Sequence, residues 1–278
     1  MTIDEIIRLT LEEDIGPGDH TSLSTIPAHK TGKSQLLVKE EGILAGVGIA
    51  EKVFHTLDPF LVFETTIPDG SVVKPGDIAF YVSGSSRSIL TGERPALNFM
   101  QRMSGIATTT RRLVKLLEGT RARILDTRKT TPLLRELEKM AVRLGGGENH
   151  RMGLYDMIMI KDNHVDFAGG IREAIDAVQD YIKIKALRLK VEIEVRNFKE
   201  LDEVLSIGKV DRIMLDNFSP DSLAKAVRLI DGRFETEASG GITTDNIRKY
   251  AETGVDYISV GALTHHIKSL DMSLKAVT

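Results

Sequence analysis

The sequence contains no cysteine and no tryptophan, and aromatic residues make up only 5% of its 278 residues. The absence of cysteine excludes disulfides, thiolate metal sites, iron–sulfur clusters and a cysteine nucleophile. It agrees with a reducing compartment, so we expect a cytoplasmic location. The scarcity of aromatic rings argues against a stacking platform for single-stranded nucleic acid.

Long apolar runs and a strong charge of one sign are also missing. No apolar stretch approaches the roughly 20 residues of a membrane span, and the acidic start Met1–Glu5 lacks the basic and apolar regions of a signal peptide. The formal net charge is −3, which provides no global field to attract nucleic acid or an anionic membrane. We therefore expect neither as a partner, and any anion-binding site must be a local cluster of Lys and Arg.

The residues that are present fall into two stretches of different rhythm. Residues 1–115 begin with an amphipathic helix and end in a helical region over about 89–118. Short strand candidates lie between them, at 35–38, 43–47, 60–63 and 78–82. This pattern predicts an N-terminal α+β open sandwich domain.

Residues 116–278 alternate short apolar strands with amphipathic helices. The strand candidates are 123–126, 157–161, 191–195, 212–216, 234–238 and 257–260. Such alternation predicts parallel strands joined by right-handed crossovers. No Gly-x-Gly-x-x-Gly motif follows the first strand, which weighs against a dinucleotide-binding fold. We therefore expect an α/β protein whose C-terminal domain is an incomplete (β/α) barrel, with its last few residues packing back on the N-terminal domain.

Polar or glycine residues stand at the end of each predicted C-terminal strand. In parallel barrels these carboxyl ends form the active-site face. A single charged side chain there can equally be solvated or paired with a neighbour, but six successive ends of this kind favour a ligand site.

The predicted strand ends have a basic and an acidic half. The basic half consists of Arg128, Lys129, His150, Arg151 and Lys161, with Arg94 and Arg135 as further candidates. Guanidinium groups match planar oxyanions, so this half favours carboxylates or phosphates. The acidic half consists of Glu194 and Asp216, with Asp162 as a further candidate. Carboxylates suit Mg²⁺ or the hydroxyls of a ribose.

Two glycine-containing turns, Ser239–Gly241 and Gly261–Leu263, follow the last two strands. Such turns can direct backbone N–H groups at a phosphate, although a plain tight turn explains each of them equally well. Together with the basic and acidic halves, they predict an enzyme for a multiply anionic, phosphate-bearing small molecule.

Longer motifs resemble a known family in order along essentially the whole chain. They are Asp126–Pro132, Gly145–Arg151, Met159–His164, Glu192–Val195, Leu215–Asn217, Glu237–Ile242 and Gly254–His265, with Glu13–Ser22 and Glu93–Asn98 before them. Together they resemble quinolinate phosphoribosyltransferase, also called nicotinate-nucleotide pyrophosphorylase (carboxylating). Leu133 departs from this pattern, because many relatives have Gly there.

The resemblance implies a reaction between quinolinate and 5-phosphoribosyl 1-pyrophosphate with Mg²⁺. The products are nicotinate mononucleotide, pyrophosphate and CO₂, for NAD synthesis. It implies that Arg128, His150, Arg151 and Lys161 hold the two quinolinate carboxylates. Arg94 is expected to join them from the neighbouring subunit of a homodimer, and the choice between dimer and hexamer stays open.

For the phosphoribosyl donor, the resemblance implies roles for Lys129, Glu194 and Asp216. The two carboxylates are expected to bind Mg²⁺, partly through water and pyrophosphate, and Lys161 completes the set of expected catalytic residues. The 5-phosphate is expected to lie against Ser239, Gly240 and Gly261.

Two other readings remain at this point. One is a related pyrophosphorylase-like protein associated with molybdenum uptake, which has a different acceptor. The other is a non-catalytic ligand-binding barrel, against which the pair Glu194 and Asp216 argues, because carboxylates would only weaken the binding of an anion.

Overall fold

The computed structural model describes residues 1–277, which form two compact units. The first, here called the N-terminal unit, consists of Met1–Arg112, Lys129–Gly146 and Ala262–Thr278. The second, the barrel unit, consists of Leu113–Arg128 and Gly147–Gly261. This division differs from the predicted one at 115/116, because the chain returns twice to the N-terminal unit. One return is the expected packing of the last residues on the N-terminal domain, whereas the sequence pattern did not indicate the return of Lys129–Gly146.

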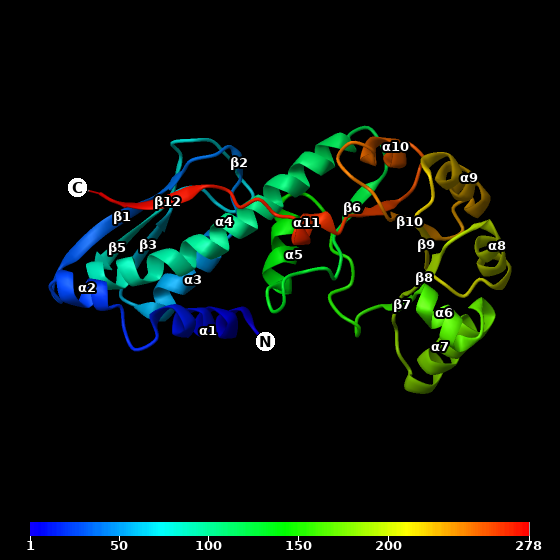
Figure 1. Ribbon diagram of the computed structural model, residues 1–278, viewed down its shortest axis with the longest axis horizontal. Helices are drawn as coiled ribbons and strands as arrows, with labels where there is room; N and C mark the ends of the chain where they lie inside the picture. The colour runs from blue at the N-terminus through cyan, green and yellow to red at the C-terminus, as the bar shows by residue number, and fades with distance from the viewer. Residues whose placement is uncertain (278) are drawn as a thin grey trace. The chain divides into compact units, whose positions relative to one another are not determined.

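A four-stranded antiparallel sheet of order β12-β1-β5-β3 forms the N-terminal unit (Figure 1). Its strands are β1 (Thr31–Val38), β3 (Val62–Thr65), β5 (Ile78–Ser85) and β12 (Met272–Ala276). The helices of this unit are α1 (Ile3–Ile15), α2 (His20–Thr25), α3 (Val47–Leu57), α5 (Arg135–Leu144), α11 (Ala262–His265) and most of α4 (Ser86–Leu116). Leu36 and Val38 of β1 are fully buried, as the alternation of a half-buried strand requires.

The predicted strand at 43–47 is wrong beyond Ile43. Only β2 (Gly42–Ile43) is extended, and it pairs with β4 (Val72–Val73). Gly46 has a φ of 97°, and helix α3 begins at the next residue, where Asp69 Oδ1 accepts the Val47 N–H at 2.8 Å. Apolar residues of this run are buried in either geometry, so their pattern alone did not separate strand from helix.

The left-handed conformation also occurs at Leu133, where φ is 67°. An L-residue with a Cβ is disfavoured there by roughly 1–2 kcal/mol, so glycine would take up this conformation at a lower cost.

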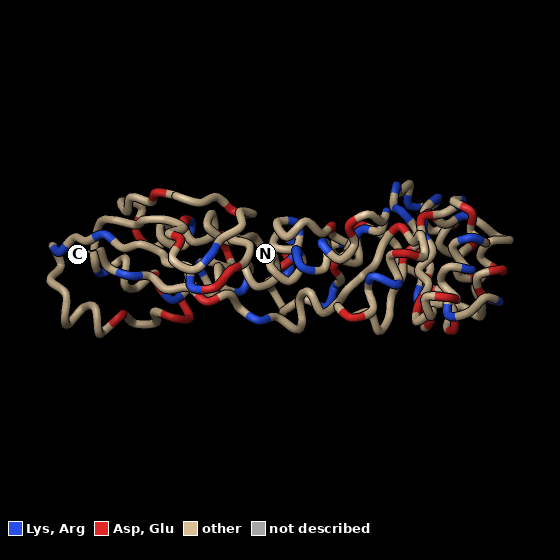
Figure 2. The backbone as a smooth tube through the Cα atoms, turned by 90° about the horizontal axis from the view of Figure 1, so that it is seen from above, with Lys and Arg blue, Asp and Glu red and all other residues tan. Residues whose placement is uncertain are grey.

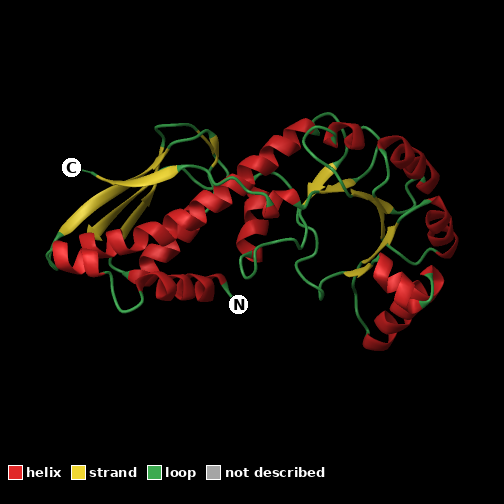
Figure 3. Ribbon diagram, in the orientation of Figure 1, coloured by secondary structure: helices red, strands yellow, loops and turns green. Residues whose placement is uncertain are grey.

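The barrel unit contains a six-stranded sheet of order β6-β11-β10-β9-β8-β7, in which each neighbouring pair is parallel. Its strands are β6 (Arg123–Leu125), β7 (Ile158–Ile160), β8 (Val191–Val195), β9 (Arg212–Asp216), β10 (Glu235–Ser239) and β11 (Tyr257–Ser259). The strands curve into an arc with helices along its outer side (Figure 3). These helices are α6 (Asp162–Ala168), α7 (Ile171–Lys185), α8 (Phe198–Ile207), α9 (Pro220–Ile230) and α10 (Ile247–Ala251). Because β6 and β7 end the order, the barrel is incomplete, and the predicted fold class is confirmed.

Charged side chains of both signs are interspersed along the backbone of the barrel unit (Figure 2). Most of these charged residues are exposed to solvent. Glu192, Arg212 and Glu237, however, are buried in three neighbouring strands. Buried charges of this kind require partners. Within the described residues, no helix is long and apolar enough to cross a membrane.

Candidate active site

The carboxyl ends of the six parallel strands bring most of the predicted site residues to one edge of the barrel unit. Asp126 follows β6, Lys161 follows β7, and Asp216 and Ser239 end β9 and β10. Ser239 and Asp216 are paired in the parallel register. We call this edge the rim. The parallel sheet explains why residues far apart in sequence meet there.

Asp126 is fully buried and holds the segment that follows α5. Its Oδ1 accepts the backbone N–H of His150 at 2.8 Å, and its Oδ2 accepts the Asn149 side-chain amide. The Glu148 N–H also donates to the Ile124 carbonyl at 2.8 Å. The segment 148–150 therefore runs along the edge of β6 that no strand covers.

Arg128 and Arg151 form the basic part of the rim. The pKa of Arg151 is lowered, first by burial and then by the positive charge of Arg128. Arg151 also donates to the Met157 carbonyl at 3.3 Å. Arg128 is exposed and Arg151 is half-buried, and two neighbouring guanidinium groups of this kind are suited to an anion with two negative charges.

Lys161, Glu194 and Asp216 form the next part of the rim. Lys161 Nζ lies 3.8 Å from Glu194 Oε2. Burial raises the pKa of Glu194, and the charge of Asp216 raises it further, while Lys161 lowers it. Two carboxylates this close to each other are suited to share a cation, and their hard oxygen atoms match Mg²⁺. The further candidate Asp162 also raises the pKa of Glu194, so it lies on the same side.

The turn after β10 depends on glycine. Gly240 has a φ of 93°, and a Cβ placed there would lie 2.2 Å from Asn217 Oδ1. Gly241 is also left-handed, with a φ of 61°. Helix α10 begins only at Ile247, so the turn Ser239–Gly241 does not lead directly into a helix. Gly261 follows β11 at the corresponding place on the neighbouring strand.

His150 points away from solvent rather than outward. It is buried, and its Nε2 lies 3.0 Å from Glu192 Oε2 and 3.4 Å from Glu237 Oε2. These two acids were not predicted as site residues. The sequence did contain a signal, because Glu192 and Glu194 of β8, and Glu235 and Glu237 of β10, are each two residues apart and so share one face of their strand.

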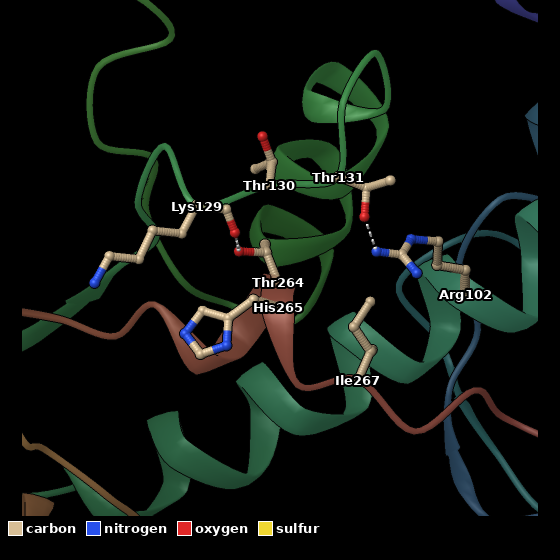
Figure 4. Close-up of a pocket in the computed structure, with 7 residues that line it drawn as sticks. All are labelled: Arg102, Lys129, Thr130, Thr131, Thr264, His265 and Ile267. Atoms are coloured by element: carbon tan, nitrogen blue, oxygen red, sulfur yellow. Dashed lines mark hydrogen bonds between the residues drawn. The ribbon is translucent and has the colours of Figure 1, made fainter.

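Lys129 lies in the N-terminal unit, in a pocket of about 550 Å³ (Figure 4). The residues that line it are Arg102, Lys129, Thr130, Thr131, Thr264, His265 and Ile267. Thr264 Oγ1 donates to the Lys129 carbonyl at 2.8 Å, and Arg102 bonds both Thr131 and the buried Glu138. Burial lowers the pKa of His265, and the charges of His266 and Lys129 lower it further. Arg102 and His265 are pocket residues that the sequence did not single out as site residues.

The other two predicted cations also lie in the N-terminal unit. Arg94 is exposed on α4. Arg135 Nε donates to Thr130 Oγ1 at 3.1 Å.

Comparison with known proteins gives matches along the whole chain. The N-terminal domain of quinolinate phosphoribosyl transferase matches residues 19–104, and its C-terminal domain matches residues 106–275. A quinolinate phosphoribosyltransferase [decarboxylating] of Nicotiana tabacum is 47% identical over 98% of this chain and 82% of that protein. A probable nicotinate-nucleotide pyrophosphorylase [carboxylating] of Bacillus subtilis is 44% identical over 94% of this chain and 89% of its own length. The crystal structure of NadC from Streptococcus pyogenes has a TM-score of 0.93 and 40% identity, and the match covers 99% of this chain and 97% of that one.

The buried role of Asp126 predicts a loss of stability on substitution. Asp126→Ala removes the acceptor of two donors in the 149–150 segment, so we expect the free energy of unfolding to fall by about 2–4 kcal/mol. Urea unfolding followed by circular dichroism measures this change. Asp180→Ala, at an exposed position of α7, is the matched control and should change stability by less than about 0.5 kcal/mol. Equal stability of the two variants would show that the Asp126 carboxylate does not hold the segment.

Proposed function

The chain belongs to the quinolinate phosphoribosyltransferase family, and on that premise we propose how its residues divide the two substrates between them. The enzyme transfers the phosphoribosyl group of 5-phosphoribosyl 1-pyrophosphate to quinolinate with loss of CO₂. It forms nicotinate mononucleotide and pyrophosphate in NAD biosynthesis. The molybdenum-associated alternative has no support among these relatives.

The observation that carries the proposal is the pair of guanidinium groups at the rim, where Arg128 lies beyond the end of β6 and Arg151 follows the segment that Asp126 holds. Arg128 and Arg151 repel each other in the absence of an anion, and quinolinate has two adjacent carboxylates. Each charge pair at about 4 Å contributes ~4 kcal/mol at an effective dielectric constant of 20. Lys161 adds a third cation on the same rim. His150 belongs to the same site, because its Nδ1 accepts the N–H of Arg151 at 2.7 Å.

The donor is assigned to Lys129, Glu194 and Asp216, with the 5-phosphate at Ser239, Gly240 and Gly261. Glu194 and Asp216 would hold Mg²⁺, which neutralises the departing pyrophosphate when bound. The pair of carboxylates fits such a cation, since burial and then the charge of Asp216 raise the pKa of Glu194. The left-handed Gly240, which packs against Asn217, allows the tight turn to which the 5-phosphate is assigned.

The proposed chemistry needs positions and charges rather than a general base. The pyridine nitrogen attacks C1 of the ribose while the bond from C1 to pyrophosphate breaks. Carboxylates of Glu194 and Asp216 stabilise the positive charge that develops on the sugar. The bond between C2 of the pyridine ring and its carboxylate then breaks, the cationic nitrogen stabilises the electron pair, and C2 takes up a proton. Arg128, Arg151 and Lys161 orient the acceptor for the first step.

The oligomer and the location belong to the proposal as well. We assign a homodimer in which Arg94 of one subunit reaches the acceptor site of the other, with a hexamer as a further assembly. Exposure of Arg94 on α4 leaves its side chain accessible for such a role. A cytoplasmic location accords with the absence of cysteine, whereas some plant relatives are named chloroplastic or mitochondrial.

The function is tested by a product assay. Purified protein with quinolinate, 5-phosphoribosyl 1-pyrophosphate and Mg²⁺ should yield nicotinate mononucleotide and CO₂ in equal amounts, measured by chromatography and CO₂ release. Nicotinate is the control acceptor and should react poorly, because it lacks the second carboxylate for the arginine pair. Turnover of another acceptor, with none of quinolinate, would refute the assignment.

The acceptor role of Arg128 predicts an unequal effect on the two substrates. We expect Arg128→Ala to weaken quinolinate binding at least about tenfold, because a charge-assisted hydrogen bond is lost. Binding of the donor should change by less than about threefold. Isothermal titration measures both, with Arg172→Ala on the exposed face of α7 as the control. A larger loss for the donor would contradict the role.

The shared site predicts complementation between two defective subunits. An Arg94→Ala subunit and a Lys161→Ala subunit each lack one acceptor contact, but their mixed dimer has one intact site. Purified mixed dimers should therefore show about half the activity of the wild-type dimer. Differently tagged, co-expressed subunits allow the mixed dimer to be isolated. Inactive mixed dimers would place Arg94 outside the site.

A further inference from the structure

Four buried charged or titratable residues lie together inside the barrel unit. The three that belong to strands have no role in the proposed function. We call His150, Glu192, Arg212 and Glu237 the interior cluster. His150 Nε2 lies 3.0 Å from Glu192 Oε2 and 3.4 Å from Glu237 Oε2, and Arg212 Nη1 lies 3.0 Å from Glu237 Oε2. Glu192 and Glu237 are fully buried, and His150 and Arg212 nearly so.

Each member of the interior cluster comes from a different part of the chain. Glu192 lies in β8, Arg212 in β9 and Glu237 in β10, so the three charges line neighbouring strands. The Arg212 guanidinium also lies 4.1 Å from the centre of the Tyr257 ring in β11. This packing fixes the carboxylate of Glu237, since its cationic partner cannot move away.

The ring of His150 is held from two sides. Its Nε2 faces the two carboxylates, and its Nδ1 accepts the N–H of Arg151 at 2.7 Å. Burial lowers the pKa of His150, but Glu192 and Glu237 raise it more, to about 9. The Arg151 N–H acts against this rise, because the charged ring would carry a proton on Nδ1 as well and could not accept that N–H. Both sets of contacts keep a proton on Nε2.

Arg151, which follows His150, has a guanidinium group that must be held in position at the rim. Arg151 shares the rim with Arg128, and repulsion between their charges lowers the pKa of Arg151. This repulsion favours a separation of the two side chains, whereas the charges of Glu192 and Asp156 attract Arg151. The backbone N–H of His150 donates to Asp126 Oδ1, and the backbone N–H of Arg151 donates to Nδ1 of the His150 ring. These two hydrogen bonds hold the backbone from which the Arg151 side chain extends.

We propose that Glu192, Glu237 and Arg212 are positioning residues for the acceptor: they hold the His150 ring by Nε2 and thereby keep the Arg151 guanidinium in place for a dicarboxylate. This inference rests on the proposed function, and it adds residues that position the acceptor-binding groups without contacting the acceptor. In enzymes, such buried partners commonly set the orientation of the groups that touch the ligand.

Metal binding is the other use that this geometry permits. His150, Glu192 and Glu237 each offer a ligand atom, and these atoms lie within 4.8 Å of one another. Arg212, however, already places a cation 3.0 Å from Glu237, and the proton on His150 Nε2 occupies the atom that a metal would need. Hydrogen bonding therefore accounts for the cluster better than a metal ion does.

Two substitutions of Glu192 distinguish the effect of its acceptor oxygen from the effect of its size. Glu192→Met keeps the length of the side chain but removes the acceptor, whereas Glu192→Gln keeps an oxygen that accepts the Nε2–H. We expect Glu192→Met to weaken quinolinate binding at least about tenfold, because the buried donor loses its partner. Glu192→Gln should recover most of this loss, and both variants should bind the donor within about threefold of wild type.

Glu235→Gln is the matched control. Glu235 also contacts Arg212, at 3.0 Å, but lies at the partly exposed edge of the strand and does not contact His150. Its quinolinate affinity should stay within about twofold of wild type. Isothermal titration and separate KM values for both substrates are the readouts. Equal losses for both substrates, or equal effects of the Met and Gln variants, would overturn the inference.

A measurement on the wild-type protein covers the case in which Glu192→Met does not fold. NMR should show a solvent-protected imidazole Nε2–H resonance, assigned to His150 by its absence in His150→Gln. A rapidly exchanging Nε2–H would overturn the inference. If wild-type protein neither binds nor converts quinolinate, the proposed function fails as well. If it converts quinolinate while the variants bind it normally, only the positioning role fails.

Discussion

The buried carboxylate of Asp126 is the contact on which the rim depends. A barrel that lacks strands has two uncovered edges, and in this unit they are β6 and β7. Asp126 receives the backbone N–H of His150 and the amide of Asn149, so a loop segment takes the place of the missing neighbour. Asp126 lies two residues before Arg128, and the segment that it holds continues into Arg151. One buried side chain therefore both closes the strand edge and helps to place two cations of the rim.

The rim stores electrostatic repulsion in two places. Arg128 opposes Arg151, and Glu194 opposes Asp216. Groups of like charge that are held together are unfavourable in the free protein and become favourable when a ligand of the opposite charge binds. In the proposed assignment, a dicarboxylate would relieve the first repulsion and a divalent cation the second. Such preorganised charges would need no rearrangement during the reaction.

The interior cluster connects this rim to the core of the barrel. Most small barrels fill their interior with apolar side chains, but three strands of this one contribute Glu192, Arg212 and Glu237. An apolar interior would pack well but would offer no acceptor for His150 Nε2. The charged interior is costly to desolvate, and its carboxylates are balanced by Arg212 and by the proton of His150. The barrel therefore supports the orientation of its rim from within.

The sequence by itself determined the strand–helix alternation, the incomplete barrel and the rim of polar strand ends. These follow from local periodicity, because short apolar runs bounded by turns alternate with amphipathic helices along this part of the chain. The motifs from Asp126 to Gly261 also identified the family, since they extend in order along the chain. Only the tertiary structure decided that Lys129–Gly146 joins the N-terminal unit and that Val47 starts a helix. It alone placed the His150 ring against Glu192 and Glu237, because these partners come from separate strands whose pairing no local pattern specifies.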